Sequence, residues 1–184
     1  PLIQYDKHGG DNQKWKLYMA PMWHMPPAGQ NFYIKCSYSD KYFDLGGADT
    51  ENNINGKELI TWNLDGGGDR IFKIISANAH SWVNIQIQNG GRFVSIPSNR
   101  SENGVSLIIH DKTNGNDQKF AIMPTSPTTF VLRTNNWKAV DVEGGTVTEN
   151  GKRILQWDTH FGASQQFQLI YADGPNKGQV YRFF

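Results

Sequence analysis

Short runs of alternating apolar and polar residues, separated by Gly, Asn and Asp, recur along the whole chain. Four segments share one register: an apolar-rich run meets a Gly/Asn/Asp-rich turn, and a second run with apolar residues at alternate positions follows. This pattern predicts a β-hairpin. Each hairpin carries two aromatic or His positions ten residues apart, namely Tyr5 and Trp15, Trp62 and Phe72, His110 and Phe120, and Trp157 and Phe167.

Three of the four hairpins follow a further pair of strand-like runs. These pairs cover residues 32–34 with 42–45, 83–87 with 92–96, and 129–132 with 139–142, and an Asn-Gly step leads from each pair into its hairpin. Positions 72, 120 and 167 are 48 and 47 residues apart, and a near-constant period of this size indicates one repeated unit of four strands. Because no window shows a convincing helical stripe of apolar positions, we expect an all-β fold.

Three units of this kind, spanning residues 31–171, favour a closed body, because closure removes exposed strand edges. Each hairpin ends in a Gln-x-aromatic element or its variant: Gln13-Lys-Trp15, Arg70-Ile-Phe72, Gln118-Lys-Phe120 and Gln165-Gln-Phe167. Together with the preceding Asn-Gly step, this element resembles the repeat of ricin-B-type lectins. The resemblance implies a β-trefoil with pseudo-threefold symmetry, in which six strands form a short barrel and three hairpins cap one end.

Composition and charge narrow the classes of function. The chain has 184 residues, which suit one domain with or without an appendage. Its 18 Lys and Arg balance 17 Asp and Glu with no long run of one sign, so charge does not indicate a nucleic-acid partner. No apolar run is long enough for a transmembrane helix. The single cysteine, Cys36, rules out an intrachain disulfide framework, and its strand-like surroundings predict a buried structural thiol.

The two aromatic positions of each hairpin have different surroundings. The second lies in an alternating apolar run, where a ring adds a large buried area to a core. The first, at Trp62 and Trp157, lies between polar residues. A flat ring in such a place suits the apolar face of a sugar, while nearby carboxylates and amides bind its hydroxyls. Surface placement or packing at the rim is the structural alternative for both indoles.

For the third repeat, the resemblance implies a sugar site in which three of four positions match. Asp141 matches the aspartate that accepts hydrogen bonds from sugar hydroxyls, and Trp157 matches the stacking ring. Gln165 matches the glutamine that orients the aspartate, whereas Ser164 replaces the usual asparagine. We expect this repeat to hold the principal site.

The first repeat keeps only half of that set. Asp44 and Trp62 occupy the aspartate and ring positions, but Asp69 and Arg70 replace the asparagine and glutamine. Arg70 is able to pair with Asp44 or Asp69, yet it cannot accept a hydrogen bond, so its supporting role differs from that of a glutamine. We expect a second, altered sugar site here.

Two copies of the hairpin are incomplete. In the second repeat, Ser95 and His110 stand at the aspartate and ring positions, so we expect no sugar site. The leading copy has Tyr5, Asn12 and Gln13 at the ring, amide and glutamine positions, but no aspartate-bearing strand pair precedes it.

The ends of the chain leave several alternatives open. Residues 1–17 are either the last hairpin of a preceding trefoil or an extra arm that packs on this domain or on another subunit. Residues 18–30, rich in Met and Pro, are expected to form a linker. Residues 172–184 form a C-terminal tail that either adds a closing strand or faces a missing domain.

These patterns predict a carbohydrate-binding lectin domain with no cofactor. The resemblance implies galactose or N-acetylgalactosamine on secreted or cell-surface glycans as ligands, an extracellular location, and a role as the targeting part of a toxin or larger secreted protein. A partner chain, a neighbouring domain or a homo-oligomer would add sites and raise avidity.

The sequence also bears on two other classes of function, an enzyme and a protein-binding trefoil. The five histidines lack zinc-ligand spacing and no Gly-x-Ser-x-Gly step occurs, so we expect neither an enzyme nor a metal site. A protein-binding trefoil, such as a protease inhibitor without sugar binding, is the main alternative. Buried indoles at Trp62 and Trp157 would favour that alternative.

Overall fold

The computed structural model of the chain describes residues 24–46, 53–76 and 82–184. The hairpin predicted at 1–17 and most of the predicted linker lie outside these residues. Within them the secondary structure is strand apart from four single-turn 3-10 helices. The strands are β1 (Asn31–Cys36), β2 (Lys41–Asp44), β3 (Ile60–Asn63), β4 (Phe72–Ser76), β5 (Trp82–Ile87), β6 (Phe93–Ser95), β7 (Val105–Ser106), β8 (Ile108–His110), β9 (Phe120–Pro124), β10 (Phe130–Thr134), β11 (Ala139–Val142), β12 (Ile154–Trp157) and β13 (Phe167–Tyr171), and the 3-10 helices are η2 (Gly68–Arg70), η3 (Pro97–Asn99), η4 (Asn116–Gln118) and η5 (Ala163–Gln165).

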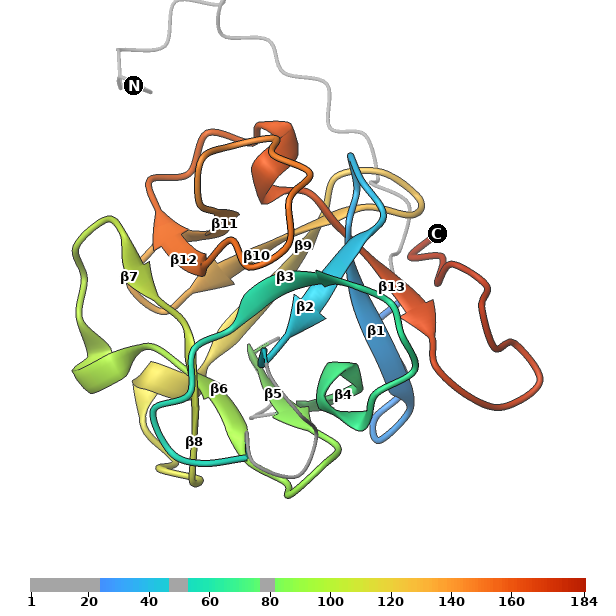
Figure 1. Cartoon of the computed structure of the whole chain (residues 1–184), viewed down its shortest axis with the longest axis horizontal. Coiled ribbons are helices and arrows are strands. Elements are labelled where there is room, and N and C mark those ends of the chain that lie inside the picture. Colours follow the sequence, from blue (N-terminus) through green and yellow to red (C-terminus); the bar gives the residue numbers. More distant parts are fainter. Residues whose placement is uncertain (1–23, 47–52, 77–81) are drawn as a thin grey trace, which may run out of the picture.

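Six of the strands close into a barrel. Going round it, β1 pairs with β4, β4 with β5, β5 with β9, β9 with β10, β10 with β13, and β13 again with β1. Every pairing is antiparallel, and the closed ring leaves none of the six strands as a free edge. Figure 1 shows this barrel with the three lobes around it. The prediction of a β-trefoil is thereby confirmed for the three repeats.

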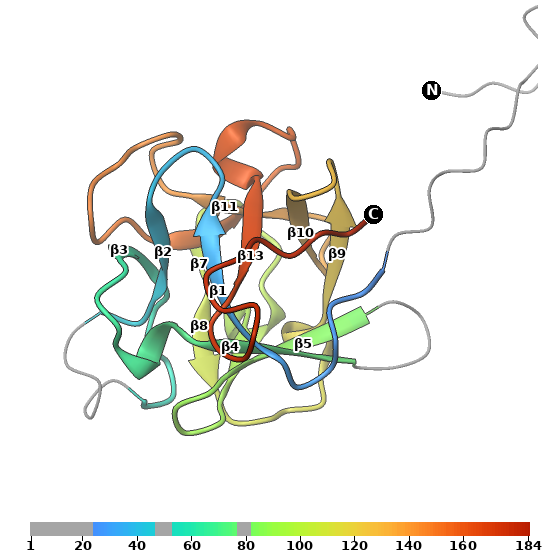
Figure 2. The same ribbon diagram turned by 90° about the vertical axis from the view of Figure 1, so that its right-hand side faces the viewer.

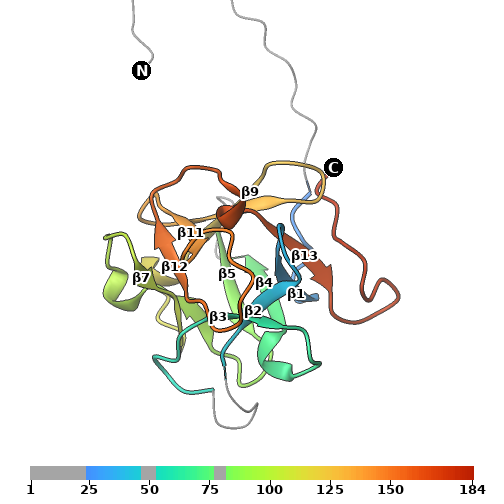
Figure 3. The same ribbon diagram turned by 45° about the horizontal axis from the view of Figure 1, so that its top comes forward.

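The remaining strands form three hairpins that cap the barrel. They are β2 with β3, β6 with β8, and β11 with β12. Around their centre the pairing is cyclic, because Glu58 pairs with Ile108, Ser106 with Leu155, and Arg153 with Ile60. Positions 58, 106 and 153 are equivalent in the three repeats, so a pseudo-threefold axis passes between them. Figure 3 shows the hairpins β2 with β3 and β11 with β12 from a second direction.

Fully buried aromatic rings fill the space between the barrel and the cap. Phe72, Phe120 and Phe167, the second aromatic residue of each hairpin, are all completely buried, as their alternating pattern predicted. The ring of Phe43 meets that of Phe167 edge to face at 5.0 Å between centroids. Cys36 is also buried in this core, and burial raises the pKa of its thiol to about 12, which matches the expected structural role.

The C-terminal tail packs on the barrel instead of leaving it. Val180 pairs with Ile170, and the rings of Tyr181 and Phe183 join the core. The N–H of His24 donates to the carbonyl oxygen of Phe183 at 2.7 Å, so the described start of the chain lies beside its end. Figure 2 shows the two segments on the same side of the barrel.

Candidate functional site

The third repeat brings all four of its predicted residues together. Asp141 lies on β11, Trp157 ends β12, and Ser164 and Gln165 belong to η5. The side chain of Asp141 is almost buried, at 5% exposure, whereas Trp157 is 44% exposed. A carboxylate at the base of a depression therefore lies beside an accessible indole.

Gln165 ties the carboxylate to the following turn. Its Nε2 donates to Asp141 Oδ2 at 2.8 Å and to the carbonyl oxygen of Asp158 at 2.9 Å. Its Oε1 accepts the backbone N–H groups of His160 and Phe161 at 2.9 and 3.1 Å. All hydrogen-bonding groups of this buried amide are thus occupied, and their directions fix which atom is nitrogen.

His160 is a second support for the carboxylate, and sequence reasoning did not single it out. Its Nδ1 accepts the N–H of Gly162 at 2.9 Å, so the neutral ring carries its proton on Nε2. That Nε2 donates to Asp141 Oδ2 at 3.0 Å. Because Gln165 and His160 both bind Oδ2, the other carboxylate oxygen is left to face a ligand. The one local sequence signal for this turn was Gly162, two positions after His160.

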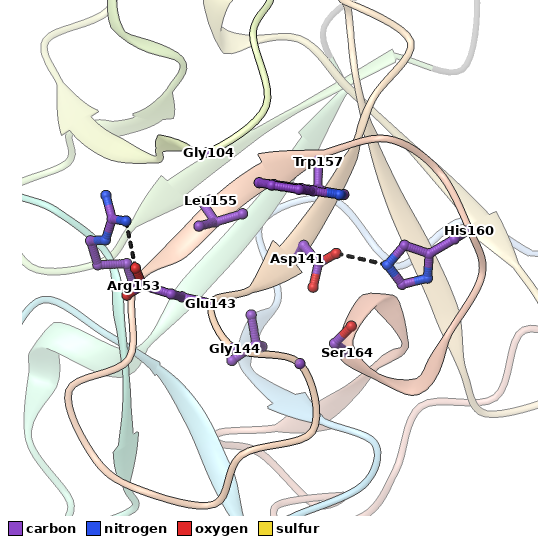
Figure 4. Close-up of a pocket in the computed structure, with 11 residues that line it drawn as sticks. Gly104, Asp141, Glu143, Gly144, Arg153, Leu155, Trp157, His160 and Ser164 are labelled. Atoms are coloured by element: carbon purple, nitrogen blue, oxygen red, sulfur yellow. Dashed lines mark hydrogen bonds and ion pairs between the residues drawn. The ribbon is translucent and has the colours of Figure 1, made fainter.

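These residues border a cavity of about 400 Å³. Figure 4 shows Trp157, His160 and Ser164 around Asp141, with Arg153 and Glu143 at the opposite end. The volume of this third-repeat cavity falls within the range of about 300–1,000 Å³ found for small-molecule sites. The lining residues are Gly104, Asp141, Val142, Glu143, Gly144, Gly145, Arg153, Leu155, Trp157, His160 and Ser164.

The residue that follows Trp157 is held by one side chain of the second repeat and one of the third. Asn103 Nδ2 donates to Asp158 Oδ2 at 2.8 Å, and Lys138 Nζ pairs with Asp158 Oδ1 at 2.6 Å. These two contacts, led by that of Lys138, hold the pKa of the Asp158 carboxyl below its usual value. Gly104, at φ 82°, lies so close to the indole that a Cβ there would come within 3.7 Å of Trp157 Cζ3. The Asn-Gly step of the second repeat therefore lies beside the ring of the next repeat and binds the residue after it.

The first repeat also assembles its predicted residues, but in a closed arrangement. Asp44 is 0% exposed, its Oδ1 accepts the N–H of Gly46, and its Oδ2 pairs with Arg70 Nε at 2.5 Å. Arg70 contacts Asp69 at 3.1 Å and also Asp65. Burial raises the pKa of the Asp44 carboxyl, although the Gly46 N–H and the Arg70 guanidinium both oppose that shift.

Trp62 of the first repeat remains accessible, with 37% of its surface exposed. The carboxylate predicted to work with it is enclosed by Arg70, so no oxygen of Asp44 reaches solvent. The first repeat thus presents a ring without an accessible aspartate.

The second repeat has a cavity of about 290 Å³ although its strand aspartate is replaced. Ser95 Oγ donates to Asp117 Oδ2 at 2.8 Å, and Thr113 Oγ1 donates to the same carboxylate. His110 lines this cavity and makes a 3.2 Å contact to the carbonyl oxygen of Asp111. The strand aspartate is absent from this repeat because Ser95 takes its place. The cavity nevertheless contains a carboxylate, that of Asp117 on η4.

Tyr5, Asn12 and Gln13 lie outside the described residues. Among residues 24–46, 53–76 and 82–184, no group of three or more His, Cys, Asp or Glu side chains is placed to hold a metal ion. No helix in this part of the chain is long and apolar enough to cross a membrane.

A protein-family comparison identifies the class of domain. The family described as "Ricin-type beta-trefoil lectin domain-like" matches residues 61–157, which is more than half of the 184-residue chain. The chain belongs to this ricin-type β-trefoil lectin-like family. No curated protein sequence is significantly similar to it.

Solved structures share the fold at low sequence identity. The designed threefold-symmetric protein ThreeFoil superposes with a TM-score of 0.70 and 19% identity, over 76% of this chain and 96% of that one. An exo-beta-1,3-galactanase from Clostridium thermocellum gives 0.69 and 20%, over 79% of this chain but 31% of the enzyme. The Macrolepiota procera ricin B-like lectin, solved in complex with lactose, gives 0.66 and 15%, over 79% and 98%.

Proposed function

We propose that this chain is a carbohydrate-binding lectin domain whose principal site is the third-repeat cavity. The observation that carries the proposal is the free carboxylate oxygen of Asp141 beside the exposed indole of Trp157. A sugar ring stacks its apolar C–H face on the indole, while a hydroxyl donates a charge-assisted hydrogen bond to the carboxylate. Gln165 and His160 hold the acceptor in place before the ligand arrives.

Galactose or N-acetylgalactosamine at the end of a glycan is the ligand we propose. Support comes from the family resemblance and from the lactose complex of the similarly folded Macrolepiota procera lectin. Binding at one shallow site is expected to be weak, with a dissociation constant of about 1 mM. Further sites on a neighbouring domain or a second copy would raise avidity on clustered glycans.

We further propose that the domain acts outside the cell as the targeting part of a larger protein. Its match to 31% of a galactanase and to 18% of a mosquitocidal holotoxin supports such an arrangement, because in both cases the shared fold is one part of a longer chain. No catalytic role is proposed for this domain. The exposure of Trp62 and Trp157 favours sugar binding over the protein-binding alternative, which called for buried indoles.

A glycan array with the wild type and two isosteric variants tests the proposal. Asp141→Asn removes the charge that accepts the sugar hydroxyl, and we expect it to abolish the signal on galactose-terminated glycans. Asp40→Asn changes an exposed aspartate that lines none of the described cavities, and its signal should equal that of the wild type. Wild-type protein that bound no glycan, or an unchanged signal for Asp141→Asn, would overturn the proposal.

A further inference from the structure

A second cavity adjoins the third-repeat cavity near the pseudo-threefold axis. Gly104 and Arg153 line the third-repeat cavity, and the same two residues line this neighbouring cavity of about 230 Å³, called the central cavity below. The central cavity lies over the start of the cap strands, where the three repeats meet. Its polar lining consists of Glu58, Arg100, Asn103, Ser106 and Arg153.

The third-repeat cavity is itself too long for one sugar ring. Arg153, Leu155 and Trp157 alternate along one strand and all line the third-repeat cavity. Four residues of strand span about 13 Å, which exceeds the width of a single pyranose. Figure 4 shows Trp157 and Arg153 on either side of Leu155.

A glycine lies at the boundary between the two cavities. Gly104 borders both cavities and holds a left-handed backbone conformation at φ 82°. Its N–H donates to the carbonyl oxygen of Gln156 at 2.9 Å, which fixes the loop against β12. Any other residue would be strained at this φ, and its Cβ would lie 3.7 Å from Trp157 Cζ3.

The central cavity offers paired charges to a ligand. Arg153 pairs with Glu143 Oε1 at 2.5 Å and donates to Ser106 Oγ at 3.1 Å. The guanidinium of Arg100 lies 3.4 Å from Glu102 Oε1. Because each cation already faces a carboxylate, the cavity suits hydroxyl groups, which both donate and accept, better than an added negative charge.

We propose that the central cavity is a second saccharide subsite, and that the third repeat therefore binds a neutral chain of at least two sugar units. This inference rests on the proposed function. The first unit stacks on Trp157 and binds Asp141. The next unit passes over Leu155 and Gly104, and its hydroxyl oxygens accept hydrogen bonds from Arg153 and Arg100.

Calorimetric titration of the full chain with methyl β-D-galactoside, lactose and β-1,3-galactotriose tests the subsite. We expect the triose to bind about tenfold more tightly than the monosaccharide, a gain equivalent to about 1.4 kcal/mol. Arg153→Ala and Arg100→Ala should each remove most of this gain, and Arg100→Ala, which lines only the central cavity, should leave the monosaccharide affinity within about twofold of the wild type. Arg182→Ala, an exposed arginine that lines neither cavity, is the matched control and should retain the gain.

The outcomes distinguish failure of the central-cavity subsite from failure of the site at Asp141 and Trp157. Equal wild-type affinities for monosaccharide and triose, or parallel loss of both affinities in Arg100→Ala, would overturn the subsite and leave the proposed function standing. Tighter binding of 6′-sialyllactose than of the triose would overturn the neutral assignment. No binding of any saccharide would overturn both proposals. If Arg153→Ala fails to fold in a thermal melt, Arg100→Ala decides, because its guanidinium makes only long contacts.

Discussion

The first and third repeats place the same four positions on the same scaffold, yet only one leaves its aspartate accessible. In the third repeat, Gln165 donates to Asp141 and accepts two backbone N–H groups, so one carboxylate oxygen remains free. In the first repeat, Arg70 pairs directly with a completely buried Asp44. The supporting residue, more than the aspartate itself, therefore decides whether this position serves a ligand or the fold.

The physical reason is the difference in hydrogen-bonding groups and charge between the supporting side chains, Gln165 and Arg70. An amide both donates and accepts, so Gln165 holds the carboxylate and the turn at the same time. A guanidinium only donates and carries a full charge, so it attracts carboxylates from several directions. Arg70 accordingly gathers Asp44, Asp65 and Asp69 around itself. The result is an ion-pair cluster in place of an open site.

The largest expected effect follows from removing that arginine. Arg70→Gln leaves the buried carboxylate of Asp44 without its cation, and we expect a loss of about 3–5 kcal/mol in the free energy of unfolding at pH 7. Burial already raises the pKa of Asp44, and loss of the guanidinium raises it further. The folded state then binds the proton more tightly than the unfolded chain, so the penalty shrinks as pH falls through the raised pKa.

Urea unfolding at pH 7 and at pH 4.5 measures both parts of this prediction, with Arg133→Gln at a partly exposed arginine as the control. A penalty that is absent, or that grows at the lower pH, would show that Arg70 does not stabilise the fold by neutralising Asp44.

The next largest effect compares the two accessible indoles. Trp157→Ala removes the stacking surface beside a free carboxylate, and we expect roughly tenfold weaker binding of lactose. Trp62→Ala removes a ring whose aspartate is enclosed, and it should change the affinity by less than about twofold. Calorimetric titration of both variants provides the test, and equal losses would indicate that the first repeat also binds the sugar.

The smallest effect concerns the orientation of the acceptor. His160→Ala deletes one of the two hydrogen bonds to Asp141 Oδ2, and loss of about 1 kcal/mol corresponds to a roughly fivefold weaker affinity for lactose. His110→Ala, at the wall of the second-repeat cavity, should leave the affinity unchanged. A parallel response of the two variants would mean that His160 does not position the carboxylate.

Much of the fold could be predicted from periodicity, because core positions are set by a repeated alternation. Phe72, Phe120 and Phe167 illustrate this, since their spacing alone placed them in the core. The turns were harder to predict. A Gly- and Asn-rich segment predicts a change of direction, but the one-turn helices η2, η4 and η5 depend on contacts with the cap.

The candidate site was less predictable than the fold. The pairing of Arg70 with Asp44 follows from their charges, whereas the complete burial of Asp44 depends on how the surrounding loops pack. His160 escaped notice because its role rests on a tertiary contact across 19 positions to Asp141. The packing of Phe183 into the core likewise required the folded chain, because the tail lies outside the repeat.

The most direct test of the account is a titration of the isotope-labelled chain with lactose, observed through the indole N–H resonances of its six tryptophans. The account predicts that the resonance of Trp157 shifts progressively and saturates with a dissociation constant of about 1 mM, while that of Trp62 stays in place. Saturable shifts of Trp62 with an unmoved Trp157 would contradict it, as would a spectrum in which no indole responds.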